Sequence, residues 1–381
     1  GDVFLVIDGW RAFCEEFEPL DVDVLALAAN GLSFGVHVVV TAARWAEIRP
    51  QLRDLLQTRV ELRLGDPSES EINRKSAAKV PSGRPGRGLH PSERHVLLAL
   101  PQVAKGVPDG VADLVDRVKS SWQGAPAPRV RLLPAVVPYE QLPRPEQQPR
   151  PELVPIGIDE EGLQPVYLDF DAEPHFYAFG ERESGKTSLL RTILRGITER
   201  YTPKQALVML VDYRHSLLEA AGPNLLEHAF HSSALRQHVD AVVPALKKRM
   251  PGPDLTPEQL KNRSWWTGPE LFVVVDDYEL VVTQGNNPLA PLAEFVPLAR
   301  DLGLHIVLAR SSGGAARALY EPLISRMREV ASPGLAMSAN KDEGQLVGNV
   351  RSRPLPPGRG TLVSRRQGTR VVQTASLPVE D

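Results

Sequence analysis

The sequence predicts an α/β fold with three layers and a mainly parallel sheet, present in two tandem copies of which the first is truncated. Short apolar, β-branched runs without polar alternation are typical of strands that are buried on both faces of a parallel sheet. Stretches with apolar residues at helical spacing lie between these runs, which indicates strand–helix alternation. The two parts of the chain also resemble each other at a constant offset, which indicates a repeated domain.

The repeat is visible in two pairs of segments. Residues 2–8 align with 270–276, and residues 35–40 align with 303–308, both at an offset of 268. Pro85-Gly-Arg-Gly88 matches Pro357-Gly-Arg-Gly360 at an offset of 272. A shared offset over this length predicts two copies of one domain. The second copy extends more than a hundred residues upstream of its aligned segment, so we expect the chain to be a fragment whose first copy lacks its front half.

In the second copy, the expected elements follow in order from residue 175. Apolar runs predict strands over 175–179, 206–211, 271–275, 305–309, 360–363 and 370–373. Helical spacing predicts helices over 187–201 and 233–250, and Pro244 should kink the second of these. Residues 254–258 indicate a helix start, with Pro257 in the first turn.

Composition limits the class of protein. The chain has 381 residues, enough for two domains at about 150 residues each. A formal net charge of −3 argues against a broad basic surface for nucleic acid. The single cysteine, Cys14, excludes an internal disulfide and indicates a reducing compartment. No apolar run approaches the ~20 residues that span a bilayer, so membrane contact would need a partner or a segment outside this sequence.

A phosphate-binding loop follows the strand at 175–179. Residues 180–187 fit the pattern G-x-x-x-x-G-K-[ST], and a strand before and a helix after it are the context that this motif requires. Backbone N–H groups of such a loop wrap phosphate, its lysine neutralises the β and γ charges, and its hydroxyl binds Mg²⁺. We therefore expect ATP and Mg²⁺ as cofactors, bound by Gly180, Glu181, Arg182, Glu183, Ser184, Gly185, Lys186, Thr187 and Ser188.

The strand at 271–275 ends in two carboxylates. Asp276 is predicted to hold Mg²⁺ together with Thr187, as in other P-loop ATPases. Asp277 stands where many such ATPases have a glutamate that activates the attacking water. Its reach is shorter by about 1 Å, and misplacement of that size can cost ~100-fold in rate. Asp276 and Asp277 are thus the candidate catalytic pair, and binding is better supported than hydrolysis.

Domain boundaries follow from a proline-rich stretch and from the motif. Six prolines lie between Pro138 and Pro155, which predicts an extended, semi-rigid linker. We expect residues 1–135 to be the C-terminal half of a P-loop ATPase domain, 136–155 to be a linker, and 156–381 to be a complete P-loop ATPase domain. At the position of Asp276-Asp277 the first copy has Asp8-Gly9, and it contains no phosphate loop of its own.

These features resemble the ATPase modules of EccC, the FtsK/SpoIIIE-type motor of type VII (ESX) secretion systems. The residues that carry the resemblance are segments of both copies: 1–10, 35–39, 59–66, 84–87, 184–187, 211–214, 247–249, 254–256, 263–266 and 275–277. On that pattern the chain is similar to the rear half of the second ATPase domain and all of the third.

The resemblance implies partners and a location. EccC proteins work at the cytoplasmic face of the bacterial inner membrane, tethered through transmembrane segments absent here or through a partner chain. They associate with other EccC domains and with subunits of the ESX membrane complex, and members form hexameric rings. They recruit small helical-hairpin substrates through a C-terminal signal, and the last ATPase domain is a docking place. The second and third domains are commonly weak hydrolases, which agrees with Gly9 and Asp277.

Weaker signals leave alternatives open. Trp265 and Trp266 could belong to a hydrophobic dock for a substrate helix, or could pack the edge of their own domain. Asp212-Tyr-Arg214 ends a predicted strand and could have a polar role near the γ-phosphate or a coupling role. Arg310 could sense phosphate or be a solvated loop residue.

Three functions therefore remain. The leading hypothesis is an ATP-binding module of a type VII secretion motor that docks substrates and regulates export, with weak or no hydrolysis. The second is a fully active ATPase that drives translocation. The third is an FtsK-like DNA translocase, against which the acidic net charge and the lack of a basic, aromatic stripe argue, so no nucleic acid partner is expected.

Overall fold

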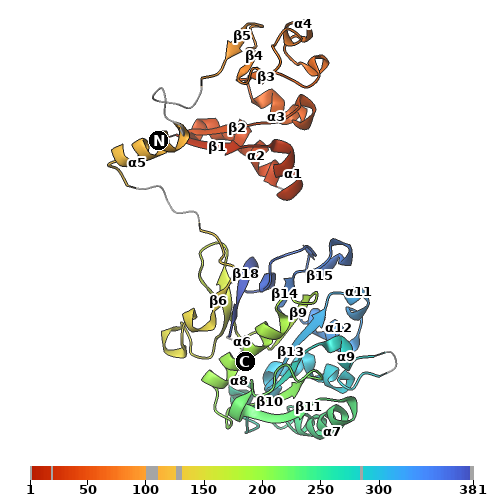
Figure 1. The fold of residues 1–381 in the computed structure, drawn as a ribbon. Helices are drawn as coiled ribbons and strands as arrows, with labels where there is room; N and C mark the ends of the chain where they lie inside the picture. The colour runs from red at the N-terminus through yellow and green to blue at the C-terminus, as the bar shows by residue number, and fades with distance from the viewer. Residues whose placement is uncertain (1, 19, 100–109, 126–130, 284–285, 378–381) are drawn as a thin grey trace. The chain divides into compact units, whose positions relative to one another are not determined.

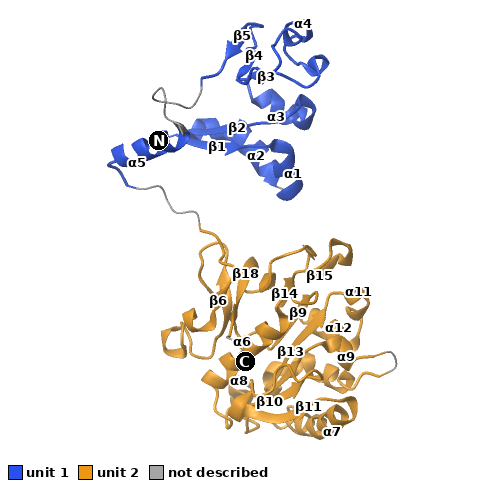
Figure 2. Ribbon diagram, in the orientation of Figure 1, with its two compact units in different colours: residues 1–127 blue, residues 128–381 orange. Residues whose placement is uncertain are grey.

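Two compact units make up the chain, Gly1–Ala127 and Pro128–Asp381 (Figure 2). The computed structural model describes residues 2–18, 20–99, 110–125, 131–283 and 286–377 (Figure 1). Each unit is described below by itself. Within the described residues, the helices are all too short or too polar to cross a lipid bilayer.

Unit 1 combines a parallel strand pair with a small antiparallel sheet. The parallel pair is β1 (Val3–Ile7) and β2 (Val36–Val40), and the antiparallel sheet has the order β3 (Glu61–Leu62), β4 (Arg87–Leu89), β5 (His95–Leu97). Helices pack around the parallel pair over a core that includes Ile7, Trp10 and Leu52. The described helices are α1 (Trp10–Glu16), α2 (Leu20–Asn30), α3 (Pro50–Leu55), α4 (Arg74–Ala77) and α5 (Gly110–Ser121).

Unit 2 is built on one large sheet. In its described part, eleven strands join, with the order β11-β10-β12-β13-β9-β14-β17-β18-β7-β8 and β6 beside β18. The run from β11 to β14 is parallel, and the strands from β14 to β8 are antiparallel to their neighbours. The strands are β6 (Val137–Pro138), β7 (Val154–Asp159), β8 (Pro165–Leu168), β9 (His175–Gly180), β10 (Ala206–Val211), β11 (Leu225–Ala229), β12 (Glu270–Val275), β13 (Leu304–Ser311), β14 (Gly334–Met337), β17 (Arg359–Ser364) and β18 (Gly368–Ser376), with a separate hairpin of β15 (Gln345–Val347) and β16 (Val350–Arg351).

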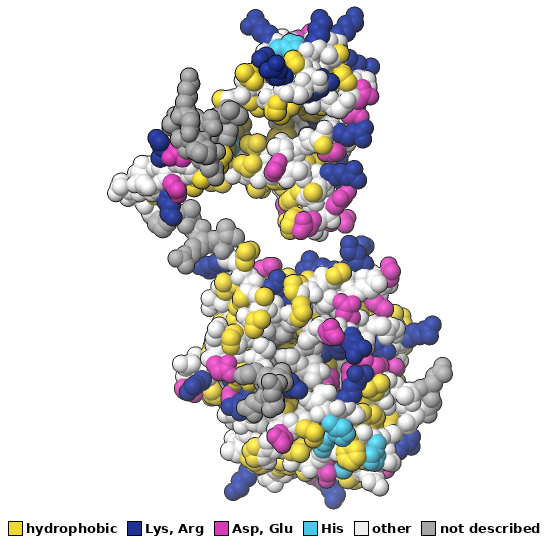
Figure 3. All heavy atoms as spheres, in the orientation of Figure 1, with side chains coloured by type: hydrophobic (Ala, Val, Ile, Leu, Met, Phe, Trp, Pro, Cys, Tyr) yellow, Lys and Arg dark blue, Asp and Glu magenta, His cyan; other side chains and the backbone are white. Residues whose placement is uncertain are grey.

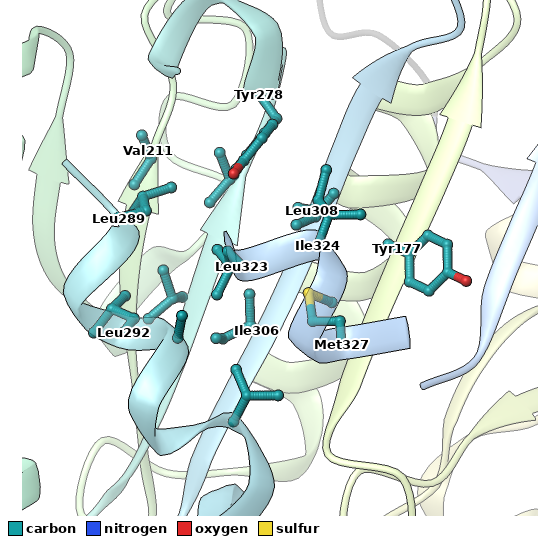
Figure 4. Packing of buried hydrophobic residues seen from close by; sticks show 14 of the residues in the cluster. Tyr177, Val211, Tyr278, Leu289, Leu292, Ile306, Leu308, Leu323, Ile324 and Met327 are labelled. Carbon is teal, nitrogen blue, oxygen red and sulfur yellow. The ribbon is translucent and has the colours of Figure 1, made fainter. Parts of the chain in front are cut away.

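Helices cover both faces of this sheet, which confirms the predicted three-layer α/β class. Apolar residues of α6 (Lys186–Arg200) form one core with the first face. On the other face, α7 (Ser232–Lys248), the 3-10 helix η7 (Ala290–Leu298) and α12 (Pro322–Glu329) enclose a second core, in which Leu292, Leu323 and Met327 pack on Ile306 and Leu308 (Figure 4). Shorter helices are α8 (Pro257–Asn262), α9 (Tyr278–Val281), α10 (Ala299–Leu302) and α11 (Ala315–Ala318).

Local signals placed most elements of unit 2 correctly. The strands at 175–179, 206–211 and 271–275 are confirmed as β9, β10 and β12. The predicted helix start is confirmed as α8, where Thr256 caps the helix and Pro257 occupies its first turn. Helix α7 spans Pro244 and continues to Lys248.

The repeat is a structural repeat with conserved register. Phe4 pairs with His37 in unit 1, and Phe272 pairs with His305 in unit 2, at the predicted offset of 268. Both aromatic pairs stack, with ring centroids 4.6 Å and 4.3 Å apart. The sheet β3-β4-β5 of unit 1 likewise has the connectivity of β14-β17-β18 in unit 2.

The proline-rich segment packs against unit 2 where the structure describes it. Val137–Pro138 forms strand β6 beside β18. Tyr139 and Leu142 are buried in a small core with Ala375, and the Tyr139 hydroxyl donates to Glu199 Oε2 at 2.8 Å. Much of this segment, which was expected to be a semi-rigid linker, therefore lies on the unit that follows it, because its few apolar side chains have a surface to cover.

Candidate functional site

The predicted phosphate-binding residues form one loop between β9 and α6. Gly180 ends β9, and the helix begins at Lys186. Gly185 stands before the helix at φ 101°, a left-handed conformation that only glycine adopts without strain. Glu181, Arg182 and Glu183 are exposed on the outer side of the loop, whereas the residues from Ser184 to Ser188 are buried or half-buried.

Lys186 places a positive charge at the centre of the loop. Its side chain is mostly buried, and Nζ donates to the carbonyl oxygens of Gly180 at 3.0 Å and Glu181 at 2.7 Å. Burial lowers the pKa of Lys186, and the carboxylates of Glu279, Asp277 and Asp276 oppose that shift. The ammonium is thus held in place by the backbone of the loop and surrounded by acidic groups.

Thr187 and Asp276 meet across the site. The Thr187 hydroxyl donates to Asp276 Oδ2 at 2.7 Å, although the two residues are 89 positions apart. Asp276 is 2% exposed, and burial raises its pKa to about 6. A hydroxyl and a carboxylate oxygen side by side are the kind of hard ligands that Mg²⁺ prefers. The structure therefore brings together the two residues predicted from sequence to hold the metal.

The loop also fits a bound phosphate. Ser184 is 2% exposed, and among the described residues its Oγ has no hydrogen-bond partner. A Cβ added at Gly185 would lie 3.0 Å from the backbone N of Gly358, so the loop has room for a backbone cradle and none for a side chain. The first turn of α6 leaves backbone N–H groups without intrahelical acceptors, and its positive end favours an anion.

Two later segments of the chain form backbone hydrogen bonds with the phosphate loop. The backbone N of Gly358 donates to Ser184 O at 2.8 Å, and the N of Glu181 donates to Ser338 O at 2.7 Å. Gly358 belongs to the motif Pro357-Gly-Arg-Gly360 that is repeated in unit 1. The motif found by the repeat thus contacts the phosphate loop, a role that its sequence did not reveal.

Asp277 is held in an unusual position. Its backbone is left-handed, with φ 44° and ψ 54°, which is uncommon for a residue other than glycine. Its Oδ2 accepts from Arg214 Nε at 2.8 Å in an ion pair. Burial raises the pKa of Asp277, and the neighbouring Glu279 carboxylate raises it further. Arg214, which belongs to the segment considered from sequence for a γ-phosphate or coupling role, therefore contacts the second of the two predicted catalytic carboxylates.

Sequence reasoning missed Glu279, and of the two alternatives for Arg310 the structure argues against a solvated loop residue. Glu279 Oε2 accepts from the backbone N of Ser311 at 3.0 Å, and Ser311 pairs with Gly180 at the start of the phosphate loop. Only the sheet order reveals this juxtaposition, because β13 lies between β12 and β9. Arg310 is 8% exposed, and its Nη1 donates to Ser311 O at 2.6 Å and to Gly313 O at 3.3 Å, so it fixes the shape of that loop.

The two tryptophans lie against their own unit. Trp265 Nε1 donates to Arg249 O at 2.7 Å, and Trp266 Nε1 donates to Asp301 O at 2.8 Å. The Arg249 guanidinium stacks over the Trp266 ring at 4.2 Å from its centre.

Arg249 also lines a mainly apolar cavity of about 100 Å³ between β11, α7 and β12. The other lining residues are Leu207, Leu226, Val242, Ala245, Leu246, Pro269, Glu270 and Leu271.

A larger cavity opens elsewhere on unit 2. It has a volume of about 430 Å³ and a more polar lining of Ala293, Glu294, Tyr320, Pro322, Ser325, Arg326 and Glu329. Arg326 Nη1 pairs with Glu329 Oε2 at 2.7 Å at its wall. The two cavities differ in chemistry, since aliphatic side chains make up most of the first lining, and charged or polar side chains make up a larger part of the second.

Comparison with known proteins places this arrangement in a family. The family model described as the FtsK/SpoIIIE family matches residues 1–105 and 140–368. The EccC protein of an ESX secretion system from Thermomonospora curvata is 53% identical over 381 residues, covering 98% of this chain and 29% of the relative. The EccC4 protein of the ESX-4 system from Mycobacterium tuberculosis is 45% identical over 378 residues, covering 99% of this chain and 30% of the relative.

A solved structure extends the similarity to three dimensions. Thermomonospora curvata EccC (ATPases 2 and 3), in complex with a signal sequence peptide, aligns over 100% of this chain and 69% of that chain. The sequence identity is 52% and the TM-score is 0.79. The chain spans about 30% of the length of the two EccC relatives.

Proposed function

The chain belongs to the FtsK/SpoIIIE family, with EccC ATPases of ESX secretion systems as its relatives, and from this premise we propose that it is an ATP-binding module of a type VII secretion motor. In this proposal the module docks secretion substrates and regulates their export, and it hydrolyses ATP weakly or not at all.

The observation that carries nucleotide binding is the contact of Thr187 with Asp276 beside the buried Lys186. Backbone N–H groups of the loop and the Lys186 ammonium would hold the β- and γ-phosphates. Thr187 would offer its hydroxyl to Mg²⁺ directly, and Asp276 would hold the ion through its water ligands. Bound Mg²⁺ supplies neutralisation of the phosphate charge.

Weak turnover is supported by the residue at position 277. The carboxylate is shorter than a glutamate, and it is engaged by Arg214 at 2.8 Å. A base must lie within hydrogen-bond reach of the water that it activates. An acid that is both short and already paired is therefore poorly placed for that work. A fully active ATPase remains the alternative, and the measurement below separates the two.

Substrate docking is assigned to the apolar cavity beside β11 and α7. Leu226, Val242 and Leu246 supply aliphatic side chains, and Arg249 and Glu270 supply charges at its edge. An amphipathic helix presents apolar residues to such a groove. The solved EccC relative contains a signal sequence peptide, which supports a signal peptide as the ligand class here. Trp265 and Trp266 support this groove indirectly, through their contacts with Arg249.

The proposal extends to partners and location. The relatives are named as ESX secretion system proteins, which supports association with other EccC domains and with subunits of an ESX membrane complex. Assembly into a hexamer and a place at the cytoplasmic side of the bacterial inner membrane are proposed on the family resemblance alone. DNA translocation is the less favoured function. On the face in Figure 3, basic and acidic side chains are interspersed over unit 2. A salt-dependent DNA-binding assay would test this alternative.

Nucleotide binding is tested by measuring ATP·Mg affinity and phosphate release on the same preparation. We expect saturable binding, negligible turnover, and a loss of affinity of about 100-fold in Lys186→Ala, since a buried charge that contacts phosphate is removed. Rapid wild-type turnover would favour the fully active ATPase. If the wild type did not bind, the nucleotide part of the proposal would be wrong.

Docking is tested with a fluorescent peptide that carries the C-terminal signal of an ESX substrate. Leu226→Asp and Val242→Asp place charge in the apolar cavity and should weaken peptide binding about tenfold or more. Tyr320→Ser in the larger cavity is the matched control and should leave binding unchanged. The reverse pattern would move the docking site to the larger cavity.

A further inference from the structure

Three carboxylates gather at the end of β12 and in the turn of α9, and each has a different partner. Asp276 accepts from the Thr187 hydroxyl at 2.7 Å. Asp277 pairs with Arg214 Nε at 2.8 Å. Glu279 accepts from the backbone N of Ser311 at 3.0 Å. The three carboxylates thus lie together, and their partners belong to three different segments of the chain.

The sheet order shows which strand lies before each of these partners in the chain. The strands run β10-β12-β13-β9, and the phosphate loop follows β9. Ser311 ends β13 and pairs with Gly180, so Glu279 is tied to the side of the phosphate loop. Arg214 follows β10, the other neighbour of β12. Its ion pair ties the Asp277 carboxylate to a turn that also contacts the phosphate-loop helix, where Arg191 Nη2 donates to Ser216 O at 2.6 Å.

The turn that presents Arg214 is itself fixed. Asp212 is 1% exposed, and its Oδ1 accepts from the backbone N of Arg214 at 3.2 Å. Its Oδ2 accepts from the backbone N of Leu217 at 2.7 Å, which closes the turn over residues 212–217. A buried carboxylate that binds two backbone N–H groups leaves the turn little freedom. The backbone that carries the Arg214 side chain is therefore fixed beside Asp277.

The backbone of Asp277 has a positive φ. Its left-handed conformation is a strained one for a residue with a Cβ, and strain of this kind clusters at functional sites. The side chain of Asp277 is 19% exposed, whereas that of Arg214 is 57% exposed. The pair can therefore open toward solvent on the Arg214 side without unpacking the core.

We propose that Arg214 is a positioning residue that holds the Asp277 carboxylate in an ion pair, so that the carboxylate is not free to take a proton from the attacking water, and thereby limits hydrolysis. This inference rests on the proposed nucleotide binding and deepens it. It assigns the low turnover to a contact within the chain, in addition to the short reach of an aspartate. Replacing Arg214 with a neutral side chain should release the carboxylate.

The test uses the full chain and measures two quantities for each variant: the affinity for a fluorescent ATP analogue with Mg²⁺, and the rate of phosphate release in a single turnover. In Arg214→Gln we expect the rate to rise about tenfold with affinity within about twofold, because the gain lies in the placement of a reacting group. Arg214→Lys retains the charge and should stay near the wild-type rate.

The double variant R214Q/D277N distinguishes positioning from a general effect of charge. If Arg214 acts through Asp277, the double variant should release phosphate no faster than Asp277→Asn alone. Arg214→Ala serves as a second neutral variant should R214Q melt at a lower temperature than the wild type.

Other outcomes would overturn the inference. An unchanged or lower rate in both neutral variants, with affinity retained, would show that Arg214 does not restrain hydrolysis. A rate increase that persists in R214Q/D277N would show that the effect bypasses Asp277. Loss of nucleotide binding in the wild type would instead refute the proposed function, and the affinity measurement identifies that case.

Discussion

The two units place different residues at one backbone position of the same fold. Gly9 follows Asp8 at the end of β1, and Asp277 follows Asp276 at the end of β12. Both positions are left-handed, with φ 81° for Gly9 and φ 44° for Asp277. The positive φ therefore belongs to the fold, since it occurs with either residue. Glycine meets it without strain, whereas unit 2 keeps a carboxylate there at a cost in backbone energy.

The preceding carboxylates, Asp276 and Asp8, also have different surroundings in the two units. In unit 2, Asp276 contacts the Thr187 hydroxyl of the phosphate-loop helix. In unit 1, the corresponding Asp8 accepts from the hydroxyl of Thr41, which follows β2. The first carboxylate thus finds a hydroxyl in both units, but only the second arrangement includes a phosphate loop within residues 1–381. The comparison therefore concerns the surroundings of the two carboxylates, since the part of unit 1 that would align with the phosphate loop lies outside this sequence.

The largest expected difference between the units comes from neutralising the first carboxylate. Asp276→Asn should weaken binding of the Mg²⁺–nucleotide complex by about 100-fold, because it removes the anionic oxygen beside Thr187. The matched change Asp8→Asn should leave affinity unchanged. Titration of a fluorescent ATP analogue with and without Mg²⁺ measures both. Equal losses in the two variants would contradict the assignment of nucleotide binding to unit 2.

Acid should lower the stability of unit 2 through a buried histidine. His175, on β9, is fully buried, and burial lowers its pKa to about 3 from a usual 6.5. Its Nδ1 accepts from Ile306 N at 3.1 Å, and its Nε2 lies 3.3 Å from Val296 O, as expected of a neutral ring. Because only the unfolded chain then binds the proton between pH 6.5 and 3, stability falls as the pH drops through that window.

Denaturant unfolding at several pH values measures this effect. In the wild type, His175 contributes a slope of up to about 1.4 kcal/mol per pH unit, and in His175→Gln that part of the slope should disappear. A slope unchanged by the substitution would contradict a buried, neutral His175. His37→Gln in unit 1 is the control, since His37 is partly exposed and should matter less.

The smallest effect is expected from exchanging the second residue of each pair. Gly9→Asp should destabilise unit 1 by about 1–2 kcal/mol, because an added Cβ has space but the backbone is left-handed. Asp277→Gly should change stability between zero and a gain of about 1 kcal/mol, since the relief of strain is offset by loss of the Arg214 ion pair. Thermal unfolding measures both. A strong loss of stability in Asp277→Gly would show that the carboxylate is a structural residue.

Sequence reasoning succeeded where the signal was local or repeated. The loop at 180–187, the strand before Asp276 and the cap of α8 each carry their information within a few residues. The offset of 268 predicted a shared register, which the pairing of Phe4 with His37 and of Phe272 with His305 confirms.

Contacts that depend on strand order could not be found in this way. Arg214 meets Asp277 because β10 neighbours β12, and Glu279 meets Ser311 because β13 lies on the other side. Neither neighbour relation follows from the spacing of residues along the chain. The packing of Tyr139 on unit 2 was missed for a similar reason, since proline content reports local stiffness and not the surface on which a segment lies.

The most direct test of the account is the stoichiometry of nucleotide binding by isothermal titration calorimetry with ATP·Mg. We predict one nucleotide per chain, with binding lost in Lys186→Ala and retained in Asp8→Asn. Two nucleotides per chain, or binding that survives Lys186→Ala, would contradict the claim that unit 2 holds the nucleotide site of residues 1–381.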